Sequence, residues 1–349
     1  MKRVLLLLIV FATAVACGDA PVTQPANDAS LQPPSMEPKT DLITPAGFPV
    51  TVLGFGAAND INARGQVVGW SWNEAGEKIA VMWDGEAMID LGTIANKDLE
   101  GLAINAKGQV AISQPRFWNG TDEERSTHFW ERGEATLIAD KTRVLGINNR
   151  GQVVGWETDV PDPLGFIWED GQFTFLKVPP EYNTNRPFSV NEAGQIAGFS
   201  GGPITRAFVW DRKGIQPLPT PGGYVSRAYS INNLGDVVGA INPDGSNDQR
   251  TAVLWRDGVL IKLGTLGGDY ASARDINARG QIVGWSLNGE GVTTAVMWDG
   301  DQIIDLGRPE GVDDLVPTDA LAINSRGQIV GWGDPGDGSR RAYMWNPRH

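Results

Sequence analysis

The sequence is poor in the residues that most often build chemical sites. Of its 349 residues, one is cysteine and two are histidine. A single cysteine excludes an internal disulfide and a zinc site with several cysteines. With His128 and His349 as the whole supply of imidazole, a metal centre with three histidine ligands is also excluded. The sequence therefore predicts no metal and no cofactor, and it offers no residue that we assign as catalytic.

Basic residues are also in short supply. There are 29 Lys and Arg against 42 Asp and Glu, which gives a formal charge of -13. Nucleic-acid binding draws on clustered basic side chains, so we expect no nucleic-acid partner. The apolar fraction of 41% and the charged fraction of 20% are typical of a folded domain.

The first residues have the pattern of an export signal. Residues 1–16 combine a positive start, an apolar run from Val4 to Ala12 and small residues before Cys17. The apolar run is too short to span a bilayer. The placement of Cys17 directly after small residues resembles a bacterial lipoprotein signal, which implies a lipid on the thiol of Cys17. The alternative is a plain secretory signal with a chance cysteine.

Residues 17–47 are rich in proline and contain no aromatic residue. This composition predicts a flexible tether between the lipid and the folded part. Without residues 1–16 the count is 27 basic against 42 acidic residues, a charge of -15. Because an acidic surface is repelled by anionic headgroups, we expect contact with the membrane only through the lipid anchor.

Residues 48–349 contain seven copies of one repeating unit. The first mark is an apolar residue and Asn, followed by two variable residues, Gly, then Gln or Asp, and a short apolar run. The Asn residues of this mark are Asn62, Asn105, Asn148, Asn191, Asn232, Asn277 and Asn324, at steps of 43, 43, 43, 41, 45 and 47. The second mark is an apolar run that ends in Trp83, Trp130, Trp168, Trp210, Trp255, Trp298 or Trp345. Strict alternation of two marks at this period indicates a propeller or a solenoid.

Each unit divides into four short strands joined by turns. In the sixth unit the predicted strands are 273–277, 281–286, 293–298 and 302–306. Residues 277–280 begin with Asn and end with Gly, which is typical of a type I turn. Asp299-Gly300 is predicted as a two-residue hairpin turn in which both residues have positive φ. No segment shows a helical stripe, so the sequence predicts an all-β domain.

The two ends of the repeat region complement each other. The last unit stops after its third strand at Trp345, and an extra strand-like segment, Val50 to Phe55, precedes the first Asn. The residues Val52-Leu53-Gly54 align with fourth-strand segments such as Lys262-Leu263-Gly264. An open solenoid would need end caps instead. We therefore predict a seven-bladed β-propeller of four-stranded antiparallel blades, closed by the N-terminal strand, and a monomer.

The marks resemble a family of bacterial extracellular repeats, the HAF repeat. The resemblance rests on Leu263 to Gly268, on Ile276-Asn277 to Gly284, and on Ala207-Phe208-Val209-Trp210. The histidine of the family's His-Ala-Phe triplet is absent, since Arg206, Thr251, Thr294 and Arg341 stand in its place. The resemblance implies a propeller-like fold and a location outside the cytoplasm, and it implies no chemistry.

The repeated residues themselves have a simple structural interpretation. Each repeated Trp can bury a large aromatic surface between neighbouring blades. Each repeated Asn can bond the backbone of its own turn. We favour these roles over a ligand-binding role for either set.

Two other sets are candidates for ligand binding. The second residue after the Asn is basic in five units: Arg64, Lys107, Arg150, Arg279 and Arg326. These residues either form a cationic ring for an anionic glycan or acidic partner, or are solvated or paired with Asp60 and Asp275. Aromatic residues follow the Val-Val-Gly run at Trp70, Trp156, Phe199, Trp285 and Trp332. They either stack on sugars or pack in the core.

The loops between second and third strands, such as 113–127, 242–249 and 333–341, differ most between units. Variable loops on a rigid ring are where binding usually occurs. We therefore hypothesise a non-catalytic binding or scaffold protein of the cell envelope, with a protein or glycan ligand. The alternative is a glycan-active enzyme that uses two carboxylates on the loop face.

Overall fold

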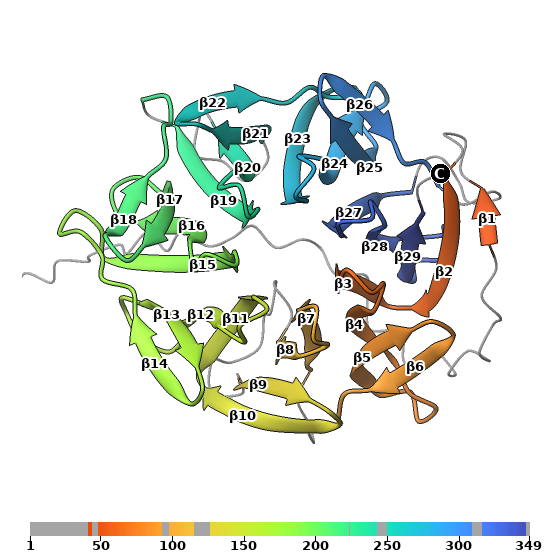
Figure 1. The fold of residues 1–349 in the computed structure, drawn as a ribbon. Helices are drawn as coiled ribbons and strands as arrows, with labels where there is room; N and C mark the ends of the chain where they lie inside the picture. Colours follow the sequence, from red (N-terminus) through yellow and green to blue (C-terminus); the bar gives the residue numbers. More distant parts are fainter. Residues whose placement is uncertain are drawn as a thin grey trace, which may run out of the picture. The chain divides into compact units, whose positions relative to one another are not determined.

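The computed structural model describes residues 41–43, 48–92, 98–114, 126–222, 224–242, 250–308 and 316–346, the first of these by backbone alone. All regular structure in these ranges is β-strand. The strands form seven antiparallel sheets, arranged as the blades of a ring (Figure 1). The prediction of an all-β, seven-bladed β-propeller is confirmed.

The strands fall into four sets according to their place in a blade. The first strands face the centre of the ring (Figure 1) and are β3 (Ala57–Ile61), β7 (Glu100–Ile104), β11 (Thr142–Ile147), β15 (Thr184–Val190), β19 (Val225–Ile231), β23 (Gly267–Ile276) and β27 (Thr318–Ile323). The second strands are β4 (Val67–Trp72), β8 (Val110–Ser113), β12 (Val153–Glu157), β16 (Ile196–Gly201), β20 (Val237–Asn242), β24 (Ile282–Asn288) and β28 (Ile329–Gly333).

The remaining strands lie farther from the centre. The third strands are β5 (Lys78–Asp84), β9 (Ser126–Glu131), β13 (Gly165–Glu169), β17 (Arg206–Asp211), β21 (Thr251–Arg256), β25 (Thr293–Asp299) and β29 (Arg341–Trp345). The fourth strands are β6 (Ala87–Asp90), β10 (Glu134–Asp140), β14 (Gln172–Phe175), β18 (Gly214–Pro217), β22 (Val259–Lys262), β26 (Gln302–Asp305) and, for the last blade, β2 (Pro49–Phe55).

The ring is closed by the N-terminal strand, as the ends of the repeat region predicted. Strand β2 pairs with β29, so that Val52 lies opposite Tyr343 and Val50 lies opposite Trp345. A further short strand, β1 (Asp41–Ile43), pairs with the outer edge of β2. These three residues belong to residues 17–47, for which the sequence predicts a flexible tether.

The turn after each first strand has the predicted geometry, whereas one hairpin turn differs. The N–H of Gly280 donates to the carbonyl of Asn277 at 3.1 Å, and Gly280 has a φ of 81°. In the predicted hairpin turn, Asp299 belongs to β25 and pairs with Gln302. The turn residues are therefore Gly300 and Asp301, and only the glycine, at φ 58°, has positive φ. The prediction was wrong by one residue because the glycine takes the first central position of the turn.

A β-bulge interrupts every first strand at the same place, three residues before the repeated Asn. The residues skipped by the pairing are Asn59, Leu102, Leu145, Phe188, Tyr229, Arg274 and Leu321. A bulge leaves one residue unpaired and changes the direction of its side chain. The ring therefore presents seven bulged residues, one per blade, on the strands that surround the channel.

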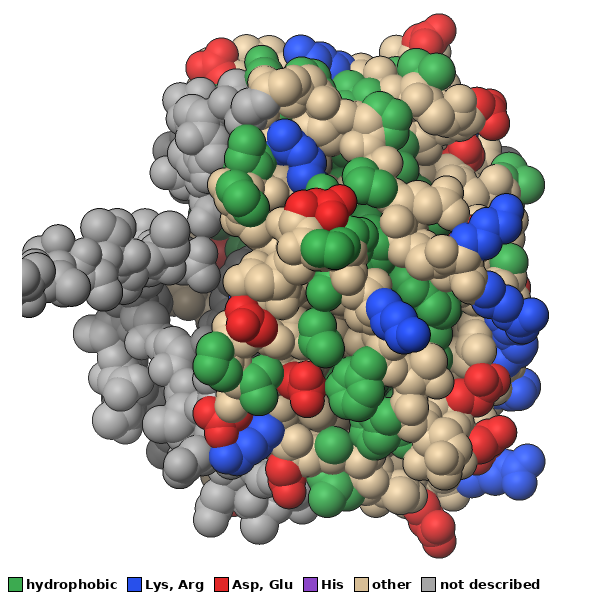
Figure 2. All heavy atoms as spheres, turned by 90° about the vertical axis from the view of Figure 1, so that its left-hand side faces the viewer, with side chains coloured by type: hydrophobic (Ala, Val, Ile, Leu, Met, Phe, Trp, Pro, Cys, Tyr) green, Lys and Arg blue, Asp and Glu red, His purple; other side chains and the backbone are tan. Residues whose placement is uncertain are grey.

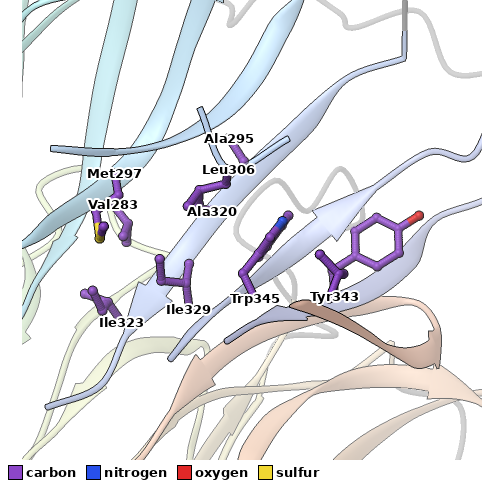
Figure 3. Packing of buried hydrophobic residues seen from close by; sticks show 10 residues of the cluster. Val283, Ala295, Met297, Leu306, Ala320, Ile323, Ile329, Tyr343 and Trp345 are labelled. Atoms are coloured by element: carbon purple, nitrogen blue, oxygen red, sulfur yellow. The ribbon is translucent and has the colours of Figure 1, made fainter. Parts of the chain in front are cut away.

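The core consists of seven clusters, one between each pair of neighbouring blades. The cluster between the sixth and seventh blades contains Val283, Met297, Ile329 and the fully buried Trp345 (Figure 3). It also includes Val50 of β2, which is fully buried. The closing strand therefore supplies core residues as well as hydrogen bonds.

Candidate functional site in the central channel

The repeated Asn residues form a closed ring of hydrogen bonds around the channel. Within its own turn, the Oδ1 of Asn62 accepts the backbone N–H groups of Arg64 and Gln66 at 2.9 and 3.1 Å, the type of interaction that the sequence predicted. The Nδ2 group of the same side chain donates to the backbone carbonyl of Asn105 in the next blade at 3.0 Å. One side chain thus organises its own turn and joins two blades.

The bond between blades occurs at all seven positions. The donor Nδ2 and acceptor carbonyl pairs are Asn62–Asn105 (3.0 Å), Asn105–Asn148 (2.9 Å), Asn148–Asn191 (3.1 Å), Asn191–Asn232 (3.1 Å), Asn232–Asn277 (3.2 Å), Asn277–Asn324 (3.2 Å) and Asn324–Asn62 (3.0 Å). The last pair joins the seventh blade to the first. Each Asn side chain is therefore fully used in holding the ring, which explains its repetition without a ligand.

The fifth blade replaces the hydrogen-bonded Gln–Asp pair of the sixth blade by an Asp–Arg ion pair. In the sixth blade, Asn277 Nδ2 donates to Gln281 Oε1, and Gln281 Nε2 donates to Asp299, both at 2.9 Å. In the fifth blade the equivalent residues are Asp236 and Arg256, which form two hydrogen bonds of 2.9 and 2.8 Å. The Arg256 guanidinium lowers the pKa of Asp236.

A cavity of about 280 Å³ opens at the end of the channel where the first strands finish. We call this end the Asn mouth, since the repeated Asn residues and their neighbours line it. Some of the lining residues are hydrogen-bonded to each other between blades: Asn149 Oδ1 accepts the N–H of Ala106 at 2.7 Å, and Glu192 accepts the N–H of Asn149 at 3.1 Å. These polar side chains again hold neighbouring turns together.

Two carboxylates lie two residues before the repeated Asn, in the first and sixth blades. Asp60 accepts the N–H groups of Ile61 and Ile104 at 2.8 Å each. Asp275 accepts the hydroxyl of Ser230 at 2.6 Å and the N–H of Ile323 at 2.9 Å. Desolvation by burial and, to a smaller extent, the charge of Asp275 raise the pKa of Asp60 to about 7, against the opposing effect of the Ile104 and Ile61 N–H groups. Burial also raises the pKa of Asp275.

These carboxylates predict a pH dependence of stability. Between its ordinary pKa of 3.8 and its folded pKa of about 7, Asp60 holds a proton in the folded protein that the unfolded chain releases. The free energy of unfolding should therefore fall as pH rises through this window, by an amount of the order of 1 to 4 kcal/mol. Thermal unfolding of the wild type and of Asp60→Asn between pH 4.5 and 7.5 tests this. We expect a flatter profile for the variant, and parallel profiles would contradict the assignment.

The five basic candidates of the sequence analysis are all exposed: Arg64, Lys107, Arg150, Arg279 and Arg326. They occupy the turns around the Asn mouth. A side view shows Lys and Arg side chains gathered along one edge of the molecule (Figure 2). The side chain of Arg64 reaches the next blade, where its guanidinium lies against Gly108. A Cβ atom added to Gly108 would be only 2.8 Å from Arg64 Nη2. The suggested pairing with Asp60 and Asp275 is not found, because those carboxylates accept the bonds described above.

The aromatic candidates are largely enclosed. Trp156 is buried, and Trp70, Phe199, Trp285 and Trp332 are half-buried. Protein cations lie over four of the five rings. The cation–ring pairs are Lys78–Trp70 (4.6 Å), Arg143–Trp156 (5.7 Å), Arg186–Phe199 (5.9 Å), Arg227–Phe199 (5.5 Å) and Arg340–Trp332 (4.3 Å). At these rings the protein itself occupies faces that a sugar would need.

A second group of residues gathers where the first strands begin, which we call the entry mouth. Arginine stands five residues before the repeated Asn in three consecutive blades, as Arg143, Arg186 and Arg227. At about 3.3 Å per residue, this position lies roughly 16 Å along the strand from the Asn. The two mouths are therefore at opposite ends of the channel.

Aromatic rings connect these arginines across blades. The bulged residue Phe188 contacts the rings of Trp156, Phe199 and Tyr229, with centroids 5.8, 5.4 and 5.6 Å away. The guanidinium of Arg274, also a bulged residue, lies 6.0 Å from the centroid of Tyr229. We define the arginine–aromatic cluster as Arg143, Arg186, Arg227, Arg250 and Arg274 together with Trp156, Phe188, Phe199 and Tyr229.

Only Trp156 and Phe199 of this cluster are among the candidates that the sequence predicted. The bulges that bring Phe188, Tyr229 and Arg274 into it leave no mark in a single sequence beyond a large residue between small ones. The arginine five residues before Asn in three successive units was a usable signal. This repeated arginine indicates a cluster only once the ring is known, because the ring places those three strands next to each other.

The remaining candidates have structural surroundings or lie outside the described residues. Of the repeated Trp residues, Trp168 and Trp210 are half-buried and the other five are buried. His128 is buried in β9. Cys17, the expected tether up to residue 40 and His349 lie outside the described residues, as do most of the variable loops 113–127 and 242–249.

Two general properties of the described ranges bear on chemistry. Within them, no three His, Cys, Asp or Glu side chains come together as a possible metal site. The described part of the chain also has no helix with the length and apolarity needed to cross a bilayer.

The fold and its closure define a seven-bladed β-propeller, and comparisons with known proteins agree at that level. No family model and no curated protein matches the sequence. Among solved structures, the β-propeller domain of the Trilobed protease from Pyrococcus furiosus aligns with a TM-score of 0.56 and 10% identity, covering 84% of this chain and 96% of that domain. That domain is described as having an open velcro topology, whereas β2 closes the last blade here.

Two longer structures, a hydrolase and a peptidase, are similar over about half of their length. Puromycin hydrolase aligns with a TM-score of 0.51 and 15% identity over 80% of this chain and 50% of its own. Pyrococcus horikoshii acylaminoacyl peptidase gives 0.51 and 10% over 82% and 53%. The present chain thus spans about half the length of these two proteins. At such identities the likeness shows the fold alone.

Proposed function

We propose that this protein is a non-catalytic binding or scaffold module of the cell envelope, displayed outside the cytoplasm on a lipid at Cys17. The HAF-type repeat resemblance and the lipoprotein-like front end support the location. The observation that carries the binding role is a division of the channel residues into two sets with different roles. The repeated polar residues hold the blades together, and the residues that differ between blades gather at the entry mouth.

Such a division is typical of a rigid scaffold that presents a binding surface. Seven Asn bonds between blades fix the relative positions of the first strands. The bulged residues then vary around the ring, with Leu in three blades and Asn, Phe, Tyr or Arg in the other four. Two carboxylates among the first strands near the entry mouth already have cationic partners: Glu100 contacts Lys78 at 2.9 Å, and Asp319 contacts Arg274 at 2.9 Å.

The location is tested by a Cys17→Ser variant. We expect wild-type protein in the membrane fraction and the variant in the soluble fraction, because acyl chains supply the membrane affinity at about 0.8 kcal/mol per buried CH₂. The matched control is Ser30→Cys in the Cys17→Ser background, which restores a thiol at the wrong place. Equal membrane association of wild type and Cys17→Ser would argue against the lipid.

The binding role is tested by a glycan array followed by product analysis of every glycan that is retained. We expect retention without cleavage. Release of shorter products would instead favour the glycan-active enzyme. Absence of any retained glycan would direct the search to protein partners.

A further inference from the structure

We infer that the arginine–aromatic cluster at the entry mouth is a binding site for a small oxyanion, a carboxylate or phosphate carried by the ligand. This inference rests on the proposed binding function and specifies its ligand class. Four neighbouring blades contribute to the cluster, the third to the sixth. Its members come from different repeats at positions that the Asn ring and the bulges bring together.

The cluster concentrates positive charge in an acidic protein. The whole chain has a formal charge of -13, yet five guanidinium groups lie in this region. Among the described residues, Arg274 has an ion pair with Asp319, at 2.9 Å. No carboxylate in the described ranges lies within ion-pair distance of Arg227 or Arg250.

The arginines also affect one another. Desolvation lowers the pKa of Arg250, Tyr229 and Asp319 act in the opposite direction, and the charges of Arg274 and Arg227 lower it further. The Nε atom of Arg250 is buried and has no hydrogen-bond partner among the described residues. Placing like charges together in a partly desolvated region is unfavourable unless an anion offsets it.

The aromatic rings orient these cations. Arg186 and Arg227 lie 5.9 and 5.5 Å from the ring centroid of Phe199, on two neighbouring first strands. Cation–π contacts of this kind restrict long side chains and so reduce the entropy lost on binding. Arg186 is exposed and Arg227 is half-buried, so neither guanidinium is fully enclosed. A planar guanidinium can bind carboxylate or phosphate through two parallel hydrogen bonds.

The size of the anion follows from the charge distribution. A long polyanion would extend from the cluster over the acidic remainder of the protein and be repelled by it. A group with one or two negative charges is attracted by the arginines of the cluster and is too small to meet this repulsion. The ligand class is therefore a small acid or the acidic end of a larger molecule.

The test is calorimetric titration of the full-length protein in detergent with glucuronate, glucose and inorganic phosphate. Glucuronate and glucose differ mainly by the carboxylate, and phosphate separates the two oxyanion sources. We expect at least one of the two anions to bind at least tenfold more tightly than glucose, with affinity that falls as salt concentration rises. Arg227→Gln and Arg250→Gln should each weaken that binding about tenfold. Arg212→Gln, at an exposed position in the hairpin between β17 and β18, should leave it unchanged.

If Arg227→Gln impairs folding, the exposed Arg186→Gln serves as the second variant. Absence of binding of both anions at millimolar concentration would overturn the site, as would equal affinity in the Arg186, Arg227 and Arg250 variants. Failure of the proposed function looks different. An oligomeric uronide that is bound and then cleaved would overturn the non-catalytic role and leave the anion site standing.

Discussion

Deletion of residues 49–55 is expected to abolish cooperative folding or to lower the melting temperature by well over 10 °C. The deletion removes β2, whose Val50 and Leu53 are buried in two different clusters between blades. It also removes the backbone pairing with β29 and exposes Tyr343 and Trp345. Burial of two aliphatic side chains and several backbone hydrogen bonds together contribute of the order of 5 to 10 kcal/mol. That is comparable to the whole stability of a typical domain.

The matched control is a chain that begins at residue 44. It loses β1, which pairs only with the outer edge of β2, and retains the closing strand. Its thermal unfolding, followed by circular dichroism, should remain close to that of the longer protein. A chain without residues 49–55 that unfolds at the same temperature as this control would show that the ring does not depend on its closure.

The second large effect is expected for Asn62→Asp. The substitution keeps an oxygen that can accept the N–H groups of Arg64 and Gln66. It removes the Nδ2 donor and places a carboxylate oxygen 3.0 Å from the carbonyl oxygen of Asn105. Asn62 is 4% exposed, so the new charge would be desolvated next to an acceptor that has lost its donor. We expect a loss of about 2 to 4 kcal/mol in the free energy of unfolding, measured by urea denaturation.

Asn288 provides a control with the same turn but without the bond between blades. Its Oδ1 accepts the N–H groups of Glu290 and Val292 at 3.0 and 2.9 Å, at the junction of β24 and β25. Asn288→Asp should cost less than about 0.5 kcal/mol, since a carboxylate accepts the same bonds at a partly solvated site. If both substitutions cost the same, the Asn ring contributes nothing beyond its turns.

The order of the strands and the closure of the ring could be predicted from the sequence, because both depend on local patterns. An Asn-x-x-Gly turn, a β-branched run and a tight hairpin each specify their own few residues. The closure of the ring followed from the number of strands at the two ends. There is an extra strand at Val50 to Phe55, and the fourth strand is missing after Trp345. The single hairpin error at Asp299 was a shift of one residue within a turn that was otherwise correct.

The candidate site could not be predicted in the same way, because its contacts join residues from different repeats. The donation from Asn324 to Asn62 spans 262 positions, and no single unit contains both partners. Phe188 meets Trp156 and Tyr229 because a bulge turns it away from the strand pairing and the ring places three blades side by side. The sequence by itself determined the repeating unit, its strands and their number. Only the tertiary structure decided which side chains face one another across the blades, since that depends on how the rigid units pack around a common axis.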